Sequence, residues 1–110
     1  MKALLLSIAL MGFSHAALAG YGAIAYSKST GAYGNSAGAW SLYEAEQLAL
    51  AKCGQYDCRI RAWEHNRCIA LATGYGHWAE AHGQYSANGA IYAAELACGP
   101  DCTWRVWSCR

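Results

Sequence analysis

The sequence has little net charge, one proline and one phenylalanine. Its 110 residues include eight basic and seven acidic side chains, so its formal charge is only +1. Proteins that bind nucleic acid normally have a basic face or tail, so this balance argues against nucleic acid as a partner. The scarcity of proline and the 55% hydrophobic content argue against disorder. We therefore predict a single folded domain.

No apolar run in the sequence is long enough to cross a bilayer. The run Ala3–Phe13 is shorter than a helix that spans a ~30 Å hydrocarbon core. Because Lys2 precedes this run and a small-x-small site at residues 17–19 follows it, we predict a signal peptide over residues 1–19, with a buried first helix as the alternative. The mature chain, residues 20–110, is then expected to be a neutral exported protein, periplasmic or extracellular, without a membrane span.

The sequence also lacks the patterns of common catalytic sites. The seven acidic residues are scattered rather than paired, and no glycine-rich segment joins a strand to a helix as a dinucleotide site requires. We expect no serine in a Gly-x-Ser-x-Gly nucleophile elbow. These absences favour a non-enzymatic protein without a cofactor, and a small hydrolase whose site only the fold assembles is an alternative.

What the chain does contain is six cysteines, an unusually high number for its length. An even number in a small exported chain indicates disulfides more often than a metal site. The Cys-x₄-Cys and Cys-x₃-Cys spacings leave zinc as the alternative, and spacing alone does not choose among the possible pairings. The six residues are Cys53, Cys58, Cys68, Cys98, Cys102 and Cys109.

An internal repeat divides the mature chain. Shifted by 45 positions, residues 24–54 align with residues 69–99 without a gap. We predict two copies, at about residues 21–67 and 68–110, that pack into one pseudo-symmetric domain. The matching pairs include Gly31 with Gly76, Tyr33 with Trp78, Gly38 with Gly83, Cys53 with Cys98, Gly54 with Gly99, Asp57 with Asp101, Cys58 with Cys102, Arg61 with Arg105 and Trp63 with Trp107.

Each copy contains the same series of expected elements. Two strands separated by a glycine-rich turn are followed by a helix and by an alternating strand. This pattern predicts an α+β fold, in which a duplicated β-β-α-β unit forms one pseudo-symmetric, disulfide-stapled domain with two helices packed on antiparallel sheet. The expected strands are residues 23–27, 33–40, 58–65, 69–73, 78–85 and 102–109.

The expected helices begin at Ser41 and Ser86. Ser41 and Glu44 have the spacing of a capping box, in which each side chain bonds a backbone N–H of the other residue. The stripe of the first helix that we expect to be buried is Leu42, Ala45, Leu48, Ala49 and Cys53.

The repeat suggests a pairing of the cysteines. Each helix ends at a cysteine and the next strand begins at one, so the turn between them can bring two Cα atoms within the ~4.4–6.8 Å that a bridge requires. We therefore predict two local bonds, Cys53–Cys58 and Cys98–Cys102, which leave Cys68–Cys109 to join the two halves.

Several short motifs resemble those of a known family. In chain order they are residues 21–25 (YGAIA), 51–54 (AKCG), 57–58 (DC), 66–72 (NRCIALA) and 106–109 (VWSC). Their order and the cysteine frame make the chain similar to the small secreted bacterial proteins of the domain-of-unknown-function 4189 family. The resemblance implies an exported bacterial protein and carries over no catalytic residue.

His77, Glu80 and His82 form the densest group of potential metal ligands. On a strand, Glu80 and His82 share one face and His77 points to the other, whereas zinc requires at least three converging ligands. We therefore expect a solvated polar strand without a metal, and these three residues are the candidates if a metal binds.

An Arg-x-Trp motif occurs in both closing strands, as Arg61 with Trp63 and as Arg105 with Trp107. Strand alternation would place the two residues of each motif on one face. Either the tryptophans are core residues whose arginines extend to solvent, or the four side chains form an exposed surface and are the candidate binding residues.

These features favour an exported, non-enzymatic protein that binds a protein partner, as an inhibitor or immunity factor of the cell envelope does. All thirteen aromatic residues of the mature chain are Tyr or Trp, two of the types enriched at interface hot spots. The same rings can stack on sugars, so a glycan- or peptidoglycan-binding module is the alternative.

Overall fold

The structure, a computed structural model, describes residues 20–109, so the predicted signal peptide lies outside the described residues. Each half of the chain contains three strands and one helix. The first half comprises β2 (Tyr21–Tyr26), β3 (Tyr33–Ala39), α1 (Leu42–Cys53) and β4 (Arg59–His65). The second half comprises β5 (Cys68–Gly74), β6 (His77–Gln84), α2 (Ala87–Cys98) and β7 (Thr103–Cys109).

The strands form two antiparallel sheets with the same topology. The order is β3-β2-β4 in the first sheet and β6-β5-β7 in the second, so the first strand of each half is the central one. The two halves thus share one element order, and the predicted α+β fold with two helices on antiparallel sheet is confirmed. The strands lie in two separate sheets, which the sequence pattern did not specify.

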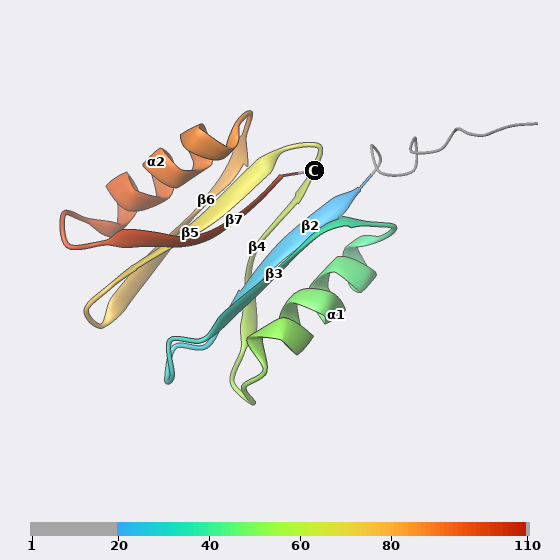
Figure 1. Cartoon of the computed structure of the whole chain (residues 1–110), viewed down its shortest axis with the longest axis horizontal. Coiled ribbons are helices and arrows are strands. Elements are labelled where there is room, and N and C mark those ends of the chain that lie inside the picture. The colour runs from blue at the N-terminus through green and yellow to red at the C-terminus, as the bar shows by residue number, and fades with distance from the viewer. Residues whose placement is uncertain (1–19, 110) are drawn as a thin grey trace, which may run out of the picture.

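The molecule is built in four layers, which can be followed in Figure 1. α1 covers the outer face of the first sheet, α2 covers the outer face of the second, and the inner faces of the sheets pack together. The core between the sheets contains the largest fully buried apolar side chains, Ile24, Ile69 and Leu71. No helix within residues 20–109 combines the length and the apolar character that a bilayer crossing requires.

Alanine fills most of the space between each helix and its sheet. Its small side chain lets the helix approach the strands closely, and glycine allows an even closer approach. A Cβ added at Gly34 of β3 would lie 2.4 Å from the backbone nitrogen of Cys53, so the end of α1 packs directly on the strand backbone. The buried alanines of these two cores are Ala23, Ala25, Ala39, Ala45, Ala49, Ala70, Ala72, Ala81, Ala90 and Ala94.

The N-terminus of α1 differs slightly from the expected capping box. The Ser41 hydroxyl accepts a hydrogen bond from the Glu44 backbone N–H at 3.1 Å, as predicted. The Glu44 carboxylate accepts instead from the N–H of Trp40, at 2.9 Å. Both hydrogen bonds of a capping box are thus present at the N-terminus of α1. The bond accepted by the Glu44 carboxylate, however, comes from Trp40, one residue before the expected donor Ser41.

The predicted buried stripe of α1 is only partly correct. Ala45, Ala49 and Cys53 are buried, but Leu48 is 44% exposed. The three buried residues are spaced by four, so they lie on one side of the helix, and Leu48 is not part of that row.

The structure contains the three predicted disulfides, Cys53–Cys58, Cys98–Cys102 and Cys68–Cys109. The expectation that the third bond joins the two halves is wrong. Cys68 begins β5 and Cys109 ends β7, and the two residues are directly paired in the second sheet. The bond therefore closes one sheet and leaves the halves to be held by non-covalent contacts.

Hydrogen bonds between β3 and β7 contribute to the contact between the halves. The buried Ser108 hydroxyl donates to the backbone carbonyl of Ser36, and the Asn35 side-chain amide donates to the carbonyl of Trp107 at 3.3 Å. Both bonds join an edge strand of one sheet to an edge strand of the other.

Candidate functional site

Most of the aromatic side chains lie on the surface. Of the thirteen Tyr and Trp residues, ten are exposed, whereas the buried core consists largely of alanine. Large aromatic rings are normally a main source of buried area, so their outward placement indicates a surface suited to contact. The exposed rings are Tyr33, Trp40, Tyr43, Tyr56, Trp63, Tyr75, Tyr85, Tyr92, Trp104 and Trp107.

The two Arg-x-Trp motifs do not present their side chains as strand alternation predicts. In β4, Ala62 pairs with Ile24 and Ile60 pairs with Ala25, so Arg61 is the extra residue of a β-bulge. As a result, Ile60 packs toward α1 and Ala62 packs between the sheets, although the sequence placed them on one face.

The second motif has the same bulge. Val106 pairs with Leu71 and Trp104 pairs with Ala72, which leaves Arg105 as the extra residue of β7. A bulge turns its residue out of the regular alternation, so an arginine and its tryptophan need not share a face.

The arginines consequently contact other residues than their tryptophans. The Arg61 guanidinium lies over the ring of Trp78, 4.6 Å from the ring centroid, and Trp78 in turn lies 5.4 Å from the ring of Tyr26. Arg105 donates from Nε to the Thr73 hydroxyl at 2.6 Å. Each guanidinium thus contacts a residue other than the tryptophan of its own motif.

The tryptophans of the motifs are neither core residues nor fully exposed. Trp63 pairs with Ala23 and Trp107 pairs with Ala70, and both alanines face the helices. Opposite residues of an antiparallel pair share a face, so both rings lie on the helix-bearing side of an edge strand. Trp63 is 48% exposed and Trp107 is 41% exposed.

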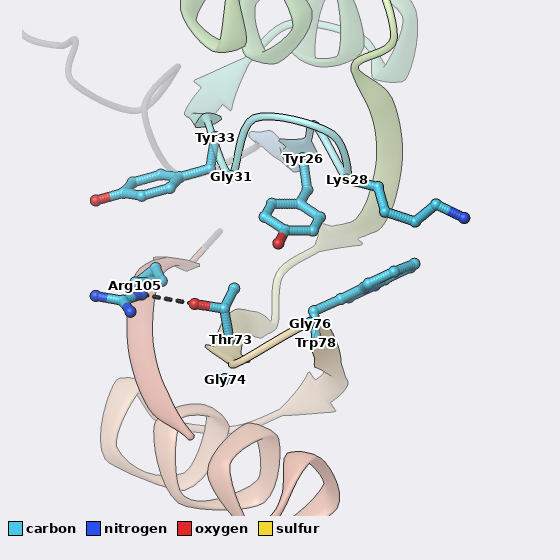
Figure 2. Close-up of a pocket in the computed structure, with 9 residues that line it drawn as sticks. All are labelled: Tyr26, Lys28, Gly31, Tyr33, Thr73, Gly74, Gly76, Trp78 and Arg105. Carbon is cyan, nitrogen blue, oxygen red and sulfur yellow. Dashed lines mark hydrogen bonds between the residues drawn. The ribbon is translucent and has the colours of Figure 1, made fainter. Parts of the chain in front are cut away.

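A cleft of about 390 Å³ opens between the two sheets, at the end where the β2–β3 and β5–β6 turns meet. Figure 2 shows that side chains of the first half approach it from one side and those of the second half from the other. Three aromatic rings and three polar side chains supply most of its wall. The lining residues are Tyr26, Lys28, Gly31, Tyr33, Thr73, Gly74, Gly76, Trp78 and Arg105.

Several of the lining residues are at positions that align with one another when the sequence is shifted by 45. Tyr33 aligns with Trp78, Gly31 with Gly76, and Lys28 with Thr73. Gly31 and Gly76 both have a φ near +80°, a conformation that favours glycine, and they keep the two turns free of side chains. The cleft is thus lined by equivalent positions of the two halves.

The cleft has a positive character. Lys28 and Arg105 line it, and no acidic side chain does. Within residues 20–109, neither cation has a carboxylate within ion-pair distance. A negatively charged group would therefore meet two cations that no carboxylate of the described chain neutralises.

The two nearby aspartates are occupied by hydrogen bonds with the turns. Asp57 accepts from the Ser27 hydroxyl at 2.6 Å and from the Ser29 backbone N–H at 3.2 Å. The bond from the Ser27 hydroxyl is the main reason why the pKa of Asp57 lies below its ordinary value of 3.8.

Asp101 has the equivalent role in the second half. Its burial raises its pKa, but bonds from the Tyr75 backbone N–H and from His77 outweigh this effect and hold the pKa below 3.8. Both aspartates thus fasten a hairpin turn to the disulfide-bonded turn that follows the helix.

The candidate metal ligands do not converge. His77 Nε2 lies 3.1 Å from Asp101, whereas His82 Nε2 lies 3.7 Å from Glu80. In the described part of the chain, the one group of three potential ligand atoms is His77 with Cys98 and Cys102. Both sulfurs of that group form a disulfide, so they are not available as thiolate ligands.

Contrary to the expectation from the sequence analysis, the chain does contain one Gly-x-Ser-x-Gly stretch, but the stretch does not form a nucleophile elbow. Residues 34–38 read Gly-Asn-Ser-Ala-Gly, yet Ser36 lies in the middle of β3 and is 3% exposed. Its hydroxyl donates to the carbonyl of Ala45 at 2.7 Å. A nucleophile elbow requires an exposed serine at a turn from a strand into a helix, so Ser36 is a structural residue.

The sequence pattern singled out Arg105 of the cleft but missed its other lining residues. Tyr33 and Trp78 align with each other at a shift of 45 positions, and this is the sequence signal that points to them. Their partners across the cleft could not be recognised, because only the packing of the two sheets brings the turns together.

Comparison with known proteins supports the fold and identifies the family. The solution NMR structure of Rv1813c from Mycobacterium tuberculosis is similar to this chain, with a TM-score of 0.66 and 26% sequence identity, over 93% of this chain and 80% of that one. No curated protein matches the chain. The sequence profile of the domain of unknown function DUF4189 matches residues 21–109, and the chain therefore belongs to the DUF4189 family.

Proposed function

We propose that this protein is an exported, non-enzymatic binding protein that acts on a protein partner, as an inhibitor or immunity factor does. The observation that carries the proposal is the exposure of ten of its thirteen Tyr and Trp side chains on a disulfide-stapled scaffold. Such rings provide large contact areas and lose little conformational entropy on binding, which is why they dominate interface hot spots.

The scaffold supports binding because disulfides and packed cores constrain its strands and helices. Three disulfides and two close-packed alanine cores fix the strands and helices before a partner arrives. A preorganised surface avoids part of the ordering cost that a flexible surface incurs on association.

The chemistry of the described residues favours binding over catalysis. All six cysteines are in disulfides, so none is available as a thiolate nucleophile. His77 and His82 lie beside carboxylates on an exposed strand, and Ser36 is buried. Disulfides persist in oxidising compartments, which supports export to the periplasm or beyond.

A glycan-binding module is the second candidate. The half-exposed rings of Trp63 and Trp107 on edge strands favour it, because flat indole faces can stack on sugar rings as well as on protein side chains. The two candidates differ in the class of molecule that these rings retain.

The test is affinity capture from a cell-envelope extract by the immobilised mature protein, followed by reconstitution with the purified captured component. We expect one protein to bind at a fixed stoichiometry. Substitution of both Trp63 and Trp107 by alanine should abolish capture while the circular dichroism spectrum stays unchanged. The control is Gln47→Ala, which changes an exposed side chain of α1 that is not aromatic and should leave capture intact.

The two candidates give different outcomes. Retention of a sugar polymer without any protein would overturn the proposed function and support the glycan-binding alternative. Cleavage of a captured molecule by the purified protein would overturn the non-enzymatic part of the proposal.

A further inference from the structure

The two halves use equivalent residues differently at the cleft. Arg61 is stacked on Trp78, and the residues equivalent to this pair are Arg105 and Tyr33. Both Arg105 and Tyr33 line the cleft, but no ring of the described chain is stacked on Arg105. Figure 2 shows their side chains on one side of the cleft, one from each half, with open space between them.

Arg105 is held in position and still has free donors. Its Nε bonds to the Thr73 hydroxyl at 2.6 Å, and Thr73 is 8% exposed, so the plane of the guanidinium is anchored to the sheet. Its two terminal amino groups have no acceptor among residues 20–109. Two parallel N–H donors of this kind match the two oxygens of a carboxylate.

The rest of the wall is flat and mostly apolar. Tyr33 faces the open space, and Tyr26 and Trp78 close the inner part of the cleft with a pair of rings 5.4 Å apart. A volume of about 390 Å³ is within the range of small-ligand pockets. The aromatic walls favour a flat apolar body next to the anionic group.

We propose that this cleft binds a carboxylate attached to a flat apolar group, with the carboxylate on Arg105 and the apolar group against Tyr33. An aromatic residue at the C-terminus of a peptide and a free aromatic acid share this chemistry. The inference deepens the proposed function, and only the choice of a partner's C-terminus as the source of the group rests on that function.

The cations around the site have separate roles. In Figure 2, Lys28 lies on the other side of the cleft from Arg105. Its positive charge therefore attracts an anion by long-range electrostatics, and it does not bind the same carboxylate as Arg105. Arg67, by contrast, lies over the ring of Tyr85 and does not line the cleft. It is a matched control, because it is also an exposed arginine and carries the same charge but lies outside the cleft.

The experiment is a titration of the disulfide-bonded mature protein followed by ¹⁵N–¹H NMR. The probes are N-acetylphenylalanine, its uncharged amide, and a short peptide that ends in phenylalanine with a free carboxylate. We expect the acid to shift the Arg105 Nε–H and Thr73 N–H resonances, and the amide to bind about tenfold more weakly or worse, because it lacks the charge-assisted bonds.

Two variants locate the site. Arg105→Gln should weaken binding of the acid by about tenfold or more, and Arg67→Gln should leave it within about twofold of the wild type. The dispersion of the NMR spectrum checks that each variant is folded. Equal losses in both variants would overturn the assignment to the cleft, because they would reflect net charge alone.

The probes also separate the two sources. Tighter binding of the peptide than of the free acid would place the group at the C-terminus of a partner, and equal binding would indicate a small aromatic acid. Equal affinity for acid and amide, or no binding of acid and peptide at about 10 mM, would overturn the inference. The capture experiment above is unaffected by that result, so the two proposals can fail separately.

Discussion

Arg61 and Arg105 are the extra residues of equivalent β-bulges, one in each edge strand that closes a half. Each bulge directs its arginine away from the tryptophan two residues later. Arg61 then completes a stack on Trp78, whereas Arg105 is fastened to Thr73 and leaves its amino groups at an open cleft. Bulges commonly occur at sheet edges and change the direction of a side chain, and here equivalent bulges give one arginine that is stacked on a ring and one that lines the cleft.

The tryptophans of the Arg-x-Trp motifs should matter less for stability than the core between the sheets. Leu71 is fully buried, so Leu71→Ala should lower the free energy of unfolding by about 2–5 kcal/mol. Trp63 is 48% exposed, and Trp63→Ala should cost about 1 kcal/mol. Urea denaturation of both variants checks this difference. A cost for Trp63→Ala as large as that for Leu71→Ala would show that Trp63 is a core residue.

The disulfide within the second sheet should stabilise the fold more than a local one. Cys68 and Cys109 are separated by 41 positions, whereas Cys98 and Cys102 are separated by four. A bond that closes a longer loop removes more entropy from the unfolded chain, so replacement of the first pair by alanine should cost about 4 kcal/mol and of the second about 2 kcal/mol. Guanidinium denaturation of the two double variants measures both values, and a reversed order would contradict the prediction.

The aspartate that anchors the first hairpin turn should make stability depend on pH. The folded pKa of Asp57 is below its ordinary value of 3.8, so its contribution is present above pH 3.8 and is lost as the pH falls through the lower, folded value. Asp57→Asn should therefore be less stable than the wild type at pH 7, and the difference should shrink at about pH 2. Urea denaturation at both pH values tests this, and a difference that is equal at the two would argue against the role of the charge.

The buried hydrogen bond between the halves should be important for their contact. Ser108→Ala would leave the Ser36 carbonyl without this donor in a buried position, at a cost of about 1–3 kcal/mol. Gln47→Ala changes an exposed polar side chain of α1 and serves as the control, with an expected change within about 0.5 kcal/mol. Hydrogen exchange of β3 and β7 amides should also increase in the Ser108 variant. Unchanged stability in that variant would mean that the bond does not hold the halves together.

Much of the fold could be predicted because its signals are local. Strand and helix positions followed from short apolar runs, from the Ser41 cap and from glycine turns, and the repeat then suggested the cysteine pairs. The errors arose where a pattern had to be extended across the chain. Leu48 fits a helical stripe but is 44% exposed, and Cys109 pairs within its own sheet instead of with the other half.

The candidate site was predictable only in part. The Arg-x-Trp motif points to Arg105, and strand alternation predicts that Arg105 and Trp107 share a face. A bulge at Arg105 changes this arrangement, and the pattern of residues along the strand does not reveal the bulge. The cleft depends on two turns that are 45 positions apart in the sequence and become neighbours only when the sheets pack.

The sequence by itself determined the elements, the repeat and the cysteine frame, because each depends on the properties of neighbouring residues. Only the tertiary structure decided that the strands form two facing sheets, that alanines fill the space between each helix and its sheet, and that most Tyr and Trp rings are exposed. The reason is that the face of a strand that becomes buried depends on register, on bulges and on the shape of the opposing half. None of these is a property of a single segment.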